Sequence, residues 1–280
     1  MEIIRTIKDM QEYSIECKRR GEKIGFVPTM GYLHEGHLSL VDIARKYADR
    51  IIMSIFVNPL QFGPNEDYEK YPRNIERDER LARERGVDAI FYPDVKEMYP
   101  DEPKITVSVK DLNKYLCGAS RPGHFEGVVT VVAKLFNIVL PDIAIFGQKD
   151  YQQYIIIKRM VKDLNFPVKI IKGPIVREYD GLAMSSRNTY LNREEREVAN
   201  YIYKGLQKAL EAFKKGKKES KELKRIVEGE ITKSPLFKVD YIEIVDGEKL
   251  KPKTRAEKGD VIAIAVFLGK TRLIDNIILE

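Results

Sequence analysis

Residues 23–48 read KIGFVPTMGYLHEGHLSLVDIARKYA, and this stretch decides the fold. Residues 23–29 form a short, largely apolar run, which predicts a buried strand, while residues 36–48 carry apolar side chains at helical spacing. A strand that leads through a turn containing glycine into a helix is the opening of a βαβ unit. We therefore expect a strand, a turn that contains Gly31 and Gly36, and then a helix.

The same alternation continues along the first part of the chain. Further segments with strand or helix patterns are predicted at 49–59 (strand), 73–86 (helix), 87–93 (strand), 126–141 (helix), 142–148 (strand), 150–165 (helix) and 166–176 (strand). Strands that alternate with helices indicate a mainly parallel sheet. The sequence thus predicts an α/β fold with a doubly wound, Rossmann-like domain over residues 1–175.

The pattern changes in the last part of the chain. Residues 192–231 read as two charged amphipathic helices around a lysine-rich connection at 214–218, followed by alternating strand patterns at 239–247, 260–269 and 271–279. Strands separated by turn residues are typical of a small antiparallel sheet. Residues 176–280 are therefore predicted to form a second, smaller α+β domain.

Composition excludes several classes of protein. The 280 residues carry 49 Lys and Arg against 43 Asp and Glu, and the net charge of +6 is spread too evenly over both halves to mark a nucleic-acid stripe. A small anionic substrate fits this charge at least as well. The two cysteines, Cys17 and Cys117, form no spacing motif and exclude a disulfide framework. No membrane span or signal peptide is expected, so we predict a cytoplasmic location.

Two of the three histidines, His34 and His37, lie at the predicted start of the first long helix. Unpaired backbone N–H groups at such a helix start bind phosphates, and Gly36 removes a side chain that would obstruct them. Alternatively, two histidines at a helix start are caps or part of a metal site. No third His, Cys or carboxylate recurs at ligand spacing, so no metal site is predicted. Spacing alone leaves phosphate binding and capping both open.

His34-Glu35-Gly36-His37 reads as the HxGH signature of the nucleotidyltransferase superfamily, which includes the class I aminoacyl-tRNA synthetases. The signature stands within four segments, at 27–41, 54–73, 121–153 and 175–191, which together resemble the pantothenate synthetase family over essentially the whole chain. The resemblance implies an ATP-dependent acid–amine ligase that condenses (R)-pantoate with β-alanine. Such an enzyme forms a pantoyl adenylate and releases AMP and pyrophosphate.

The resemblance also implies site residues. Those implied to contact ATP are Met30, Gly31, His34, Gly36, His37, Gly147, Gln148, Lys149, Asp150, Val176, Met184, Ser185, Ser186 and Arg187. Four of them, His34, His37, Lys149 and Arg187, are implied to act on the phosphates in catalysis. Asn58, Gln61 and Gln153 are implied to bind the substrates pantoate and β-alanine. Asp150 is also a plausible N-cap of the helix that begins at Tyr151.

Mg²⁺ is expected to arrive with the triphosphate, bound through phosphate oxygens and water rather than by a protein cage. The resemblance implies a homodimer, and we expect neither a nucleic-acid partner nor a membrane. Two alternatives stay open: a nucleotidylyltransferase that transfers AMP or CMP and stops there, and a tRNA-binding relative of the class I synthetases. The roles of Arg121 and His124, and any contact of Asp67 with Mg²⁺, also stay open.

Overall fold

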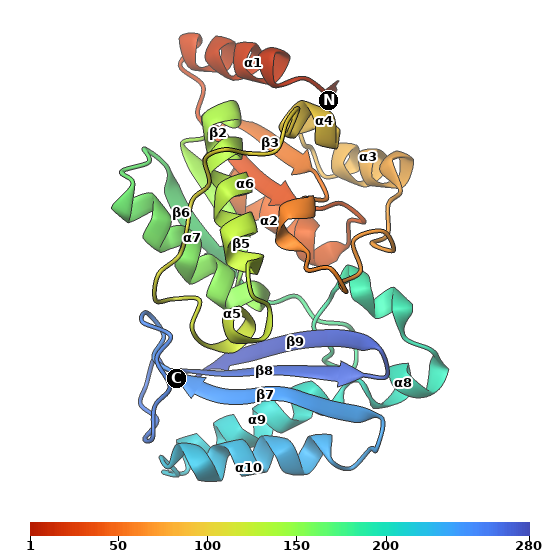
Figure 1. Ribbon diagram of the computed structural model, residues 1–280, viewed down its shortest axis with the longest axis vertical. Coiled ribbons are helices and arrows are strands. Elements are labelled where there is room, and N and C mark those ends of the chain that lie inside the picture. The colour runs from red at the N-terminus through yellow and green to blue at the C-terminus, as the bar shows by residue number, and fades with distance from the viewer. The chain divides into compact units, whose positions relative to one another are not determined.

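Six parallel strands form the larger sheet, in the order β1-β4-β3-β2-β5-β6 (Figure 1). The structure, a computed structural model, describes residues 1–280. The strands are β1 (Glu2–Ile4), β2 (Ile24–Thr29), β3 (Arg50–Ile55), β4 (Ala89–Phe91), β5 (Ile143–Gly147) and β6 (Lys169–Gly173). The central strands are almost entirely buried, which explains their nearly continuous apolar sequences.

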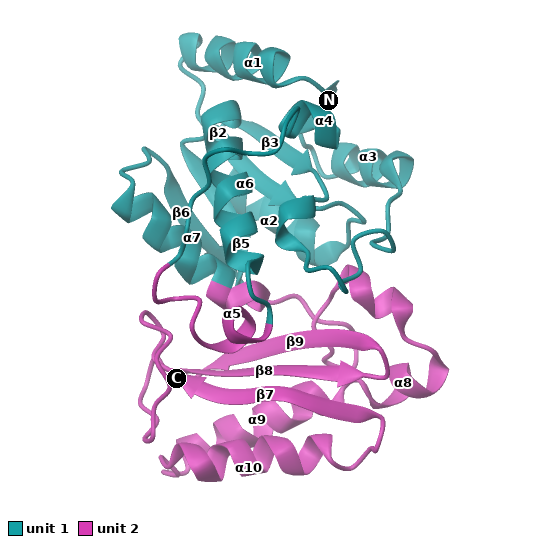
Figure 2. Ribbon diagram, in the orientation of Figure 1, with its two compact units in different colours: residues 1–109, 121–148, 153–174 teal, residues 110–120, 149–152, 175–280 magenta.

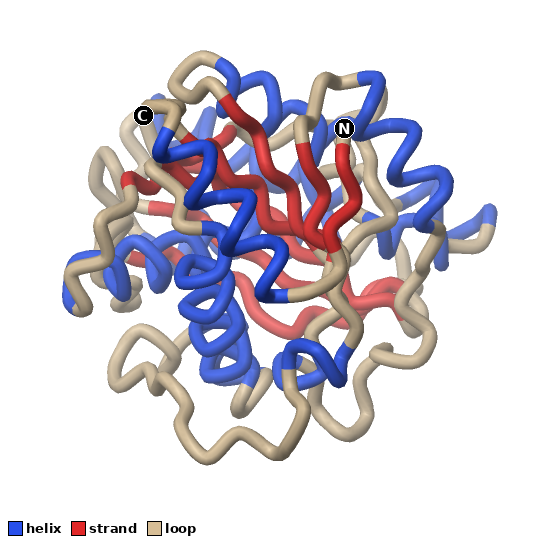
Figure 3. Tube along the Cα trace, turned by 90° about the horizontal axis from the view of Figure 1, so that it is seen from above, coloured by secondary structure: helices blue, strands red, loops and turns tan.

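Helices cover both faces of this sheet (Figure 3). They are α1 (Ile7–Arg19), α2 (Glu35–Arg45), α3 (Ile75–Glu84), α4 (Val95–Met98), α6 (His124–Val139) and α7 (Tyr151–Asp163). Val27 packs in one core with Val41 of α2, whereas the ring of Phe26 meets Phe136 of α6, with 6.5 Å between centroids. Successive residues of β2 thus serve opposite faces. None of the helices combines the length and the apolar character that a bilayer span requires.

The strand order confirms the predicted doubly wound α/β fold. From β2 the chain proceeds through β3 to β4 on one side, and β5 and β6 then lie on the other side of β2. The order therefore reverses between β2 and β5. In open α/β sheets, ligands bind outside the carboxyl ends of the strands at such a switch point. This edge is where Met30 follows β2 and where Gly147 ends β5.

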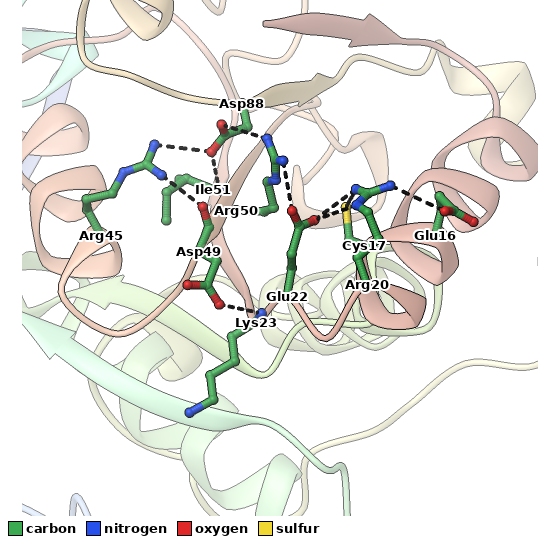
Figure 4. A network of polar contacts seen from close by, with 10 residues as sticks. All are labelled: Glu16, Cys17, Arg20, Glu22, Lys23, Arg45, Asp49, Arg50, Ile51 and Asp88. Carbon is green, nitrogen blue, oxygen red and sulfur yellow. Dashed lines mark hydrogen bonds and ion pairs between the residues drawn. The ribbon is translucent and has the colours of Figure 1, made fainter.

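A network of ion pairs stabilises the opposite, amino-terminal edge of the same sheet (Figure 4). The Asp88 carboxylate accepts the N–H of Ile51 at 2.7 Å, near the start of β3. Arg50 lies 3.6 Å from Asp88 and 2.8 Å from Glu22. Bonds from Arg50 and Arg20 lower the pKa of Glu22 from 4.5 to about 2. These contacts therefore stabilise the amino-terminal edge of the sheet. The switch point lies at the other edge, at the carboxyl ends of the strands.

The second sheet is antiparallel, in the order β7 (Phe237–Val245), β8 (Val261–Leu268) and β9 (Thr271–Ile278). Its helices are α5 (Leu116–Ser120), α8 (Arg193–Val198), α9 (Tyr201–Lys214) and α10 (Ser220–Ile231). Apolar side chains of α9 and α10, such as Leu206 and Val227, share one core with Ile264 of β8. The predicted α+β character is confirmed, with three helices after residue 192 where the sequence predicts two.

The chain divides into two compact units that differ from the predicted domains 1–175 and 176–280 (Figure 2). Unit 1 comprises residues 1–109, 121–148 and 153–174, and unit 2 comprises 110–120, 149–152 and 175–280. Two segments predicted to lie in the first domain thus pack in unit 2. Hydrogen bonds explain this: Gln152 donates to Leu112 O at 2.7 Å, and Cys117 Sγ lies 3.2 Å from the Tyr241 hydroxyl.

Candidate active site

The loop between β2 and α2 is held by a buried carboxylate of α3. Asp78 is 1% exposed, and its oxygens accept the backbone N–H groups of Tyr32 at 2.6 Å and Leu33 at 2.7 Å. Gly31 and Tyr32 have positive φ angles of 85° and 51°, so the chain turns sharply here. Burial raises the pKa of Asp78, and the two loop N–H bonds oppose that rise. The carboxylate thus positions the loop that leads into His34.

His34 and His37 close the first turn of α2 as a reciprocal cap. His34 is the N-cap residue, and its Nδ1 accepts the N–H of Gly36 at 3.1 Å, while His37 Nδ1 accepts the N–H of His34 at 3.4 Å. The ring centroids are 4.0 Å apart. A neutral imidazole whose Nδ1 accepts a hydrogen bond carries its proton on Nε2. Capping is therefore correct for both histidines and is compatible with phosphate binding, because the capping bonds use Nδ1 of each ring and not Nε2.

Asn58 and Gln61 lie in the turn that follows β3. Asn58 caps the 3₁₀ turn Pro59–Gln61, and its Nδ2 donates to Gln61 Oε1 at 3.2 Å. Gln61 Nε2 lies 3.1 Å from Met30 Sδ. Unit 1 therefore brings together three predicted site residues from the carboxyl ends of two neighbouring strands, β2 and β3.

Close packing against α6 fixes this turn. A Cβ at Gly127 would lie 2.1 Å from Leu60 O, which is too close for any side chain. Gly127 O in turn accepts a hydrogen bond from Asn58 Nδ2 at 3.1 Å. Gly127 is therefore required for the backbone of α6 to approach the Asn58–Gln61 turn.

Arg121 and His124, whose roles the sequence leaves open, bind the backbone of Gln61. His124 Nδ1 lies 2.8 Å from Gln61 O, which can only accept, so Nδ1 is the donor and Nε2 accepts from Arg121 at 3.0 Å. Arg121 donates from Nε and Nη2 to the two carboxylate oxygens of Glu66, at 2.6 Å each. Burial raises the pKa of Glu66, but the Arg121 bonds outweigh burial and lower it. These three side chains tie the start of α6 to the segment after β3.

In unit 2, the segment 176–187 folds back on itself. Met184 N donates to Val176 O at 3.0 Å, and the Ser185 hydroxyl accepts the N–H of Arg187 at 3.3 Å to cap the 3₁₀ turn Ser186–Tyr190. Ser186 is buried, at 6% exposed. The residues predicted to contact adenine and phosphate thus form one short hairpin with a capped turn.

Lys149 and Asp150 also belong to unit 2. Asn276 of β9 donates to Lys149 O at 2.9 Å, and Lys149 Nζ lies 3.5 Å from the Asp150 carboxylate. Asp150 is the last residue of a 3₁₀ turn, Gln148–Asp150, that runs directly into α7. The prediction that Asp150 is the N-cap of α7 is therefore wrong, because an N-cap has non-helical backbone angles.

Buried Asp275 is bound by Arg177 and interacts with the charge of Lys149. Burial raises the pKa of Asp275, and the Arg177 guanidinium and the Lys149 charge oppose the rise. Arg177 holds this carboxylate through two bonds, of 2.6 and 3.1 Å. Because Arg177 follows Val176 directly, β9 links the hairpin 176–187 with the segment that carries Lys149.

The remaining predicted residues lie on elements that follow β5. Gly147 is its last residue, Gln148 follows in the 3₁₀ turn, and Gln153 is half-buried in the first turn of α7. No group of three or more His, Cys, Asp or Glu side chains comes together in a way that could hold a metal ion.

The family model described as Pantoate-beta-alanine ligase matches residues 2–278. The chain belongs to the pantoate-beta-alanine ligase family. A pantothenate synthetase of Caldicellulosiruptor bescii is 56% identical over 280 residues, which are 100% of this chain and 99% of that protein. The crystal structure of pantothenate synthetase from Thermus thermophilus superposes with a TM-score of 0.94 at 45% identity, covering 100% of this chain and 99% of that one.

A pantoate-beta-alanine ligase from Francisella tularensis, solved in complex with β-γ ATP and β-alanine, superposes with a TM-score of 0.82 at 37% identity. The match covers 99% of this chain and 97% of that one. The similarity to pantoate-beta-alanine ligases therefore extends over both units and all the predicted site residues.

Sequence reasoning missed three residues that shape the site: Asp78, Gly127 and Tyr99, whose hydroxyl donates to Asn58 Oδ1 at 3.0 Å. Asp78 lies in the charged helix α3, where its acidic side chain resembles those of the solvated face. Its spacing offers one signal: Asp78 lies four residues before Ala82, so both side chains share one face of α3, and both are buried. Gly127 and Tyr99 are far in sequence from Asn58, so no local pattern marks them.

Proposed function

We propose that this protein uses ATP to join pantoate to β-alanine, forming pantothenate, AMP and pyrophosphate. The observation that carries the proposal is the capped pair His34 and His37, which lies at the switch point of a chain that belongs to this ligase family over its whole length. The adjacent amides of Asn58 and Gln61 suit a polyhydroxy acid. The imidazole and amide groups thus include donors for the nucleotide's phosphates and for the oxygens of the acid substrate.

In the proposed first step, a carboxylate oxygen of pantoate attacks the α-phosphorus of ATP. The bond from that phosphorus to the bridging oxygen breaks, and pyrophosphate leaves with the electron pair. Negative charge therefore grows on the phosphate oxygens in the transition state. We assign Nε2–H of His34 and His37 to these oxygens, because donors held in place beforehand stabilise the transition state more than the ground state. Their capping bonds hold the rings.

Further residues are assigned to the same nucleotide. Lys149 and Arg187 would neutralise phosphate charge, and the guanidinium could bind two phosphate oxygens at once. Backbone and small polar groups would complete the contacts, from Met30, Gly31, Gly36, Gly147, Gln148, Asp150, Val176, Met184, Ser185 and Ser186. The hairpin that gathers residues 176–187 supports the assignment of its members to one ligand.

Mg²⁺ would bind through the triphosphate and water. Mg²⁺ is a hard cation that commonly keeps several water ligands and binds through substrate phosphates, which supports this form of binding. The ion would neutralise charge on the phosphates, while the residues of this chain orient them.

In the proposed second step, the β-alanine amine attacks the carbonyl carbon of pantoyl adenylate. The carbon–oxygen bond to AMP breaks, AMP leaves with the electron pair, and the amine loses a proton. Asn58, Gln61 and Gln153 are assigned to the acid substrates, and Gln61 would contact both. No enzyme nucleophile is needed, so catalysis depends on orientation and charge stabilisation.

A product assay tests the proposal. ATP, pantoate and Mg²⁺ are mixed with the enzyme, and AMP is measured with and without β-alanine. We expect AMP and pantothenate only when β-alanine is present, and His37→Ala should slow pyrophosphate release roughly 10²–10³-fold. Absence of AMP with all substrates present would favour a nucleotidylyltransferase instead, and near-normal release by His37→Ala would remove His37 from the mechanism.

We also propose a homodimer formed through the predicted first domain, residues 1–175, which the family resemblance supports. Light scattering on the purified chain tests it: a mass of about twice the 32.4 kDa of one chain is expected, and a monomeric mass would contradict it.

A further inference from the structure

Tyr99, a half-buried residue, places its hydroxyl against the proposed acid-binding turn. Tyr99 directly follows α4, and its hydroxyl donates to Asn58 Oδ1 at 3.0 Å. Asn58 is 1% exposed and Gln61 is 9% exposed, so water cannot readily replace this bond. Burial raises the pKa of Tyr99, which keeps the phenol protonated and able to donate.

Two backbone groups determine which way the Asn58 amide points. Gly127 O can only accept, and it lies 3.1 Å from Nδ2, whereas the N–H of Leu60 can only donate, and it lies 3.3 Å from Oδ1. A flipped amide would place oxygen against oxygen and N–H against NH₂. Tyr99 therefore meets the oxygen of Asn58 and must act as the donor.

The Asn58 amide passes this polarity to Gln61. Nδ2 of Asn58 donates to Gln61 Oε1 at 3.2 Å, so the other end of the Gln61 amide, Nε2, points toward Met30. The thioether sulfur of Met30 is a weak acceptor at 3.1 Å. A carboxylate or hydroxyl oxygen accepts such a bond far better, so Gln61 is oriented to bind an acceptor.

We propose that Tyr99 is a positioning residue for the acid substrate: its hydroxyl adds a third bond to the two backbone bonds that orient the Asn58 amide, and so strengthens the orientation that presents Gln61 Nε2 as a donor beside Met30. This inference rests on the proposed assignment of Gln61 to pantoate. Without the hydroxyl, Asn58 Oδ1 retains only the longer bond from Leu60, and rotation of both amides becomes easier. In part of the population, the Gln61 amide would then turn its oxygen instead of its NH₂ group toward the substrate carboxylate.

The ring of Tyr99 can stay in place when its hydroxyl is removed. It packs near Phe56, with 6.2 Å between ring centroids, and Lys134 Nζ lies 5.5 Å from its centre. Tyr99→Phe therefore removes one hydrogen bond and leaves the packing of the ring unchanged.

The test compares Tyr99→Phe with Tyr13→Phe in steady-state kinetics. Tyr13 is a matched control: it is a half-buried tyrosine of α1 whose pKa burial raises to about 12, and it lies near Asp88 and Arg50 at the amino-terminal edge. We expect Tyr99→Phe to raise the KM for pantoate about 3- to 10-fold, the worth of one hydrogen bond. The KM for ATP should change no more than in Tyr13→Phe.

A double mutant shows whether Tyr99 acts through Gln61. If it does, Tyr99→Phe combined with Gln61→Ala raises the pantoate KM no further than Gln61→Ala alone. Multiplied effects, or equal rises in the KM for ATP and pantoate, would overturn the proposal, as would a pantoate KM equal to that of Tyr13→Phe. If Gln61→Ala itself leaves the pantoate KM unchanged, the assignment of Gln61 fails first, and this inference fails with it.

Discussion

Replacing Gly31 by alanine should damage both stability and catalysis. A left-handed backbone, here φ +85°, costs a residue with a Cβ about 1–2 kcal/mol. The new Cβ would also lie 2.8 Å from Ile55 Cγ2 and 3.0 Å from Asp78 Oδ2, and such overpacking costs about 1–3 kcal/mol. Reduced freedom of the unfolded chain offsets about 0.4–1 kcal/mol. We expect a net loss of about 1–5 kcal/mol, combining these ranges.

Gly21→Ala separates the two causes. Gly21 also has a positive φ, +76°, but nothing lies within 4 Å of the position of its Cβ. Urea unfolding should therefore show a loss of only about 1 kcal/mol for Gly21→Ala, the backbone contribution alone. Pyrophosphate release should stay normal in Gly21→Ala and fall in Gly31→Ala, whose displaced Asp78 loosens the loop before His34. Equal stability losses with normal activity in both variants would refute the role given to this loop.

Three other changes test separate parts of unit 1. Gly127→Ala should raise the KM for pantoate and leave that for ATP nearly unchanged, because its Cβ would displace the Asn58–Gln61 turn; parallel rises would point to misfolding. Asp78→Asn should lower the unfolding free energy by about 1–3 kcal/mol in urea titrations, since an amide cannot accept both loop N–H bonds. Glu22 has a pKa lowered from 4.5 to about 2, so its stabilising effect is complete above pH 4.5 and is lost as the pH falls toward 2. The difference in melting temperature between the native chain and Glu22→Gln should shrink over that range, and a constant difference would contradict the ion-pair explanation.

The order of elements follows from local patterns of the sequence. The apolar runs at 23–29, 49–59 and 142–148 became β2, β3 and β5, with ends that differ from the prediction by a few residues. Buried parallel strands need continuous apolar sequences, so the pattern is strong. The three-residue strand β1 and the charged helix α1 were not predicted, because short or strongly polar elements carry little periodic signal.

The pairing of His34 with His37 was also predictable, because residues three apart at a helix start meet regardless of the rest of the chain. The boundary between the units was harder to predict from the sequence. Residues 110–120 join unit 2 through contacts with strands that come more than a hundred residues later, such as Ser120 with Asp240. No composition change marks them.

The sequence by itself determined the doubly wound sheet, the family and the two imidazoles at the mouth of α2, since each depends on residues that are neighbours in the chain. Only the tertiary structure decided what holds them: Asp78 binds the loop from 45 residues away, and Tyr99 reaches Asn58 from 41 residues away. Such bonds form because burial removes competing water from a donor and an acceptor that folding happens to bring together. Their partners carry no mark in the local sequence.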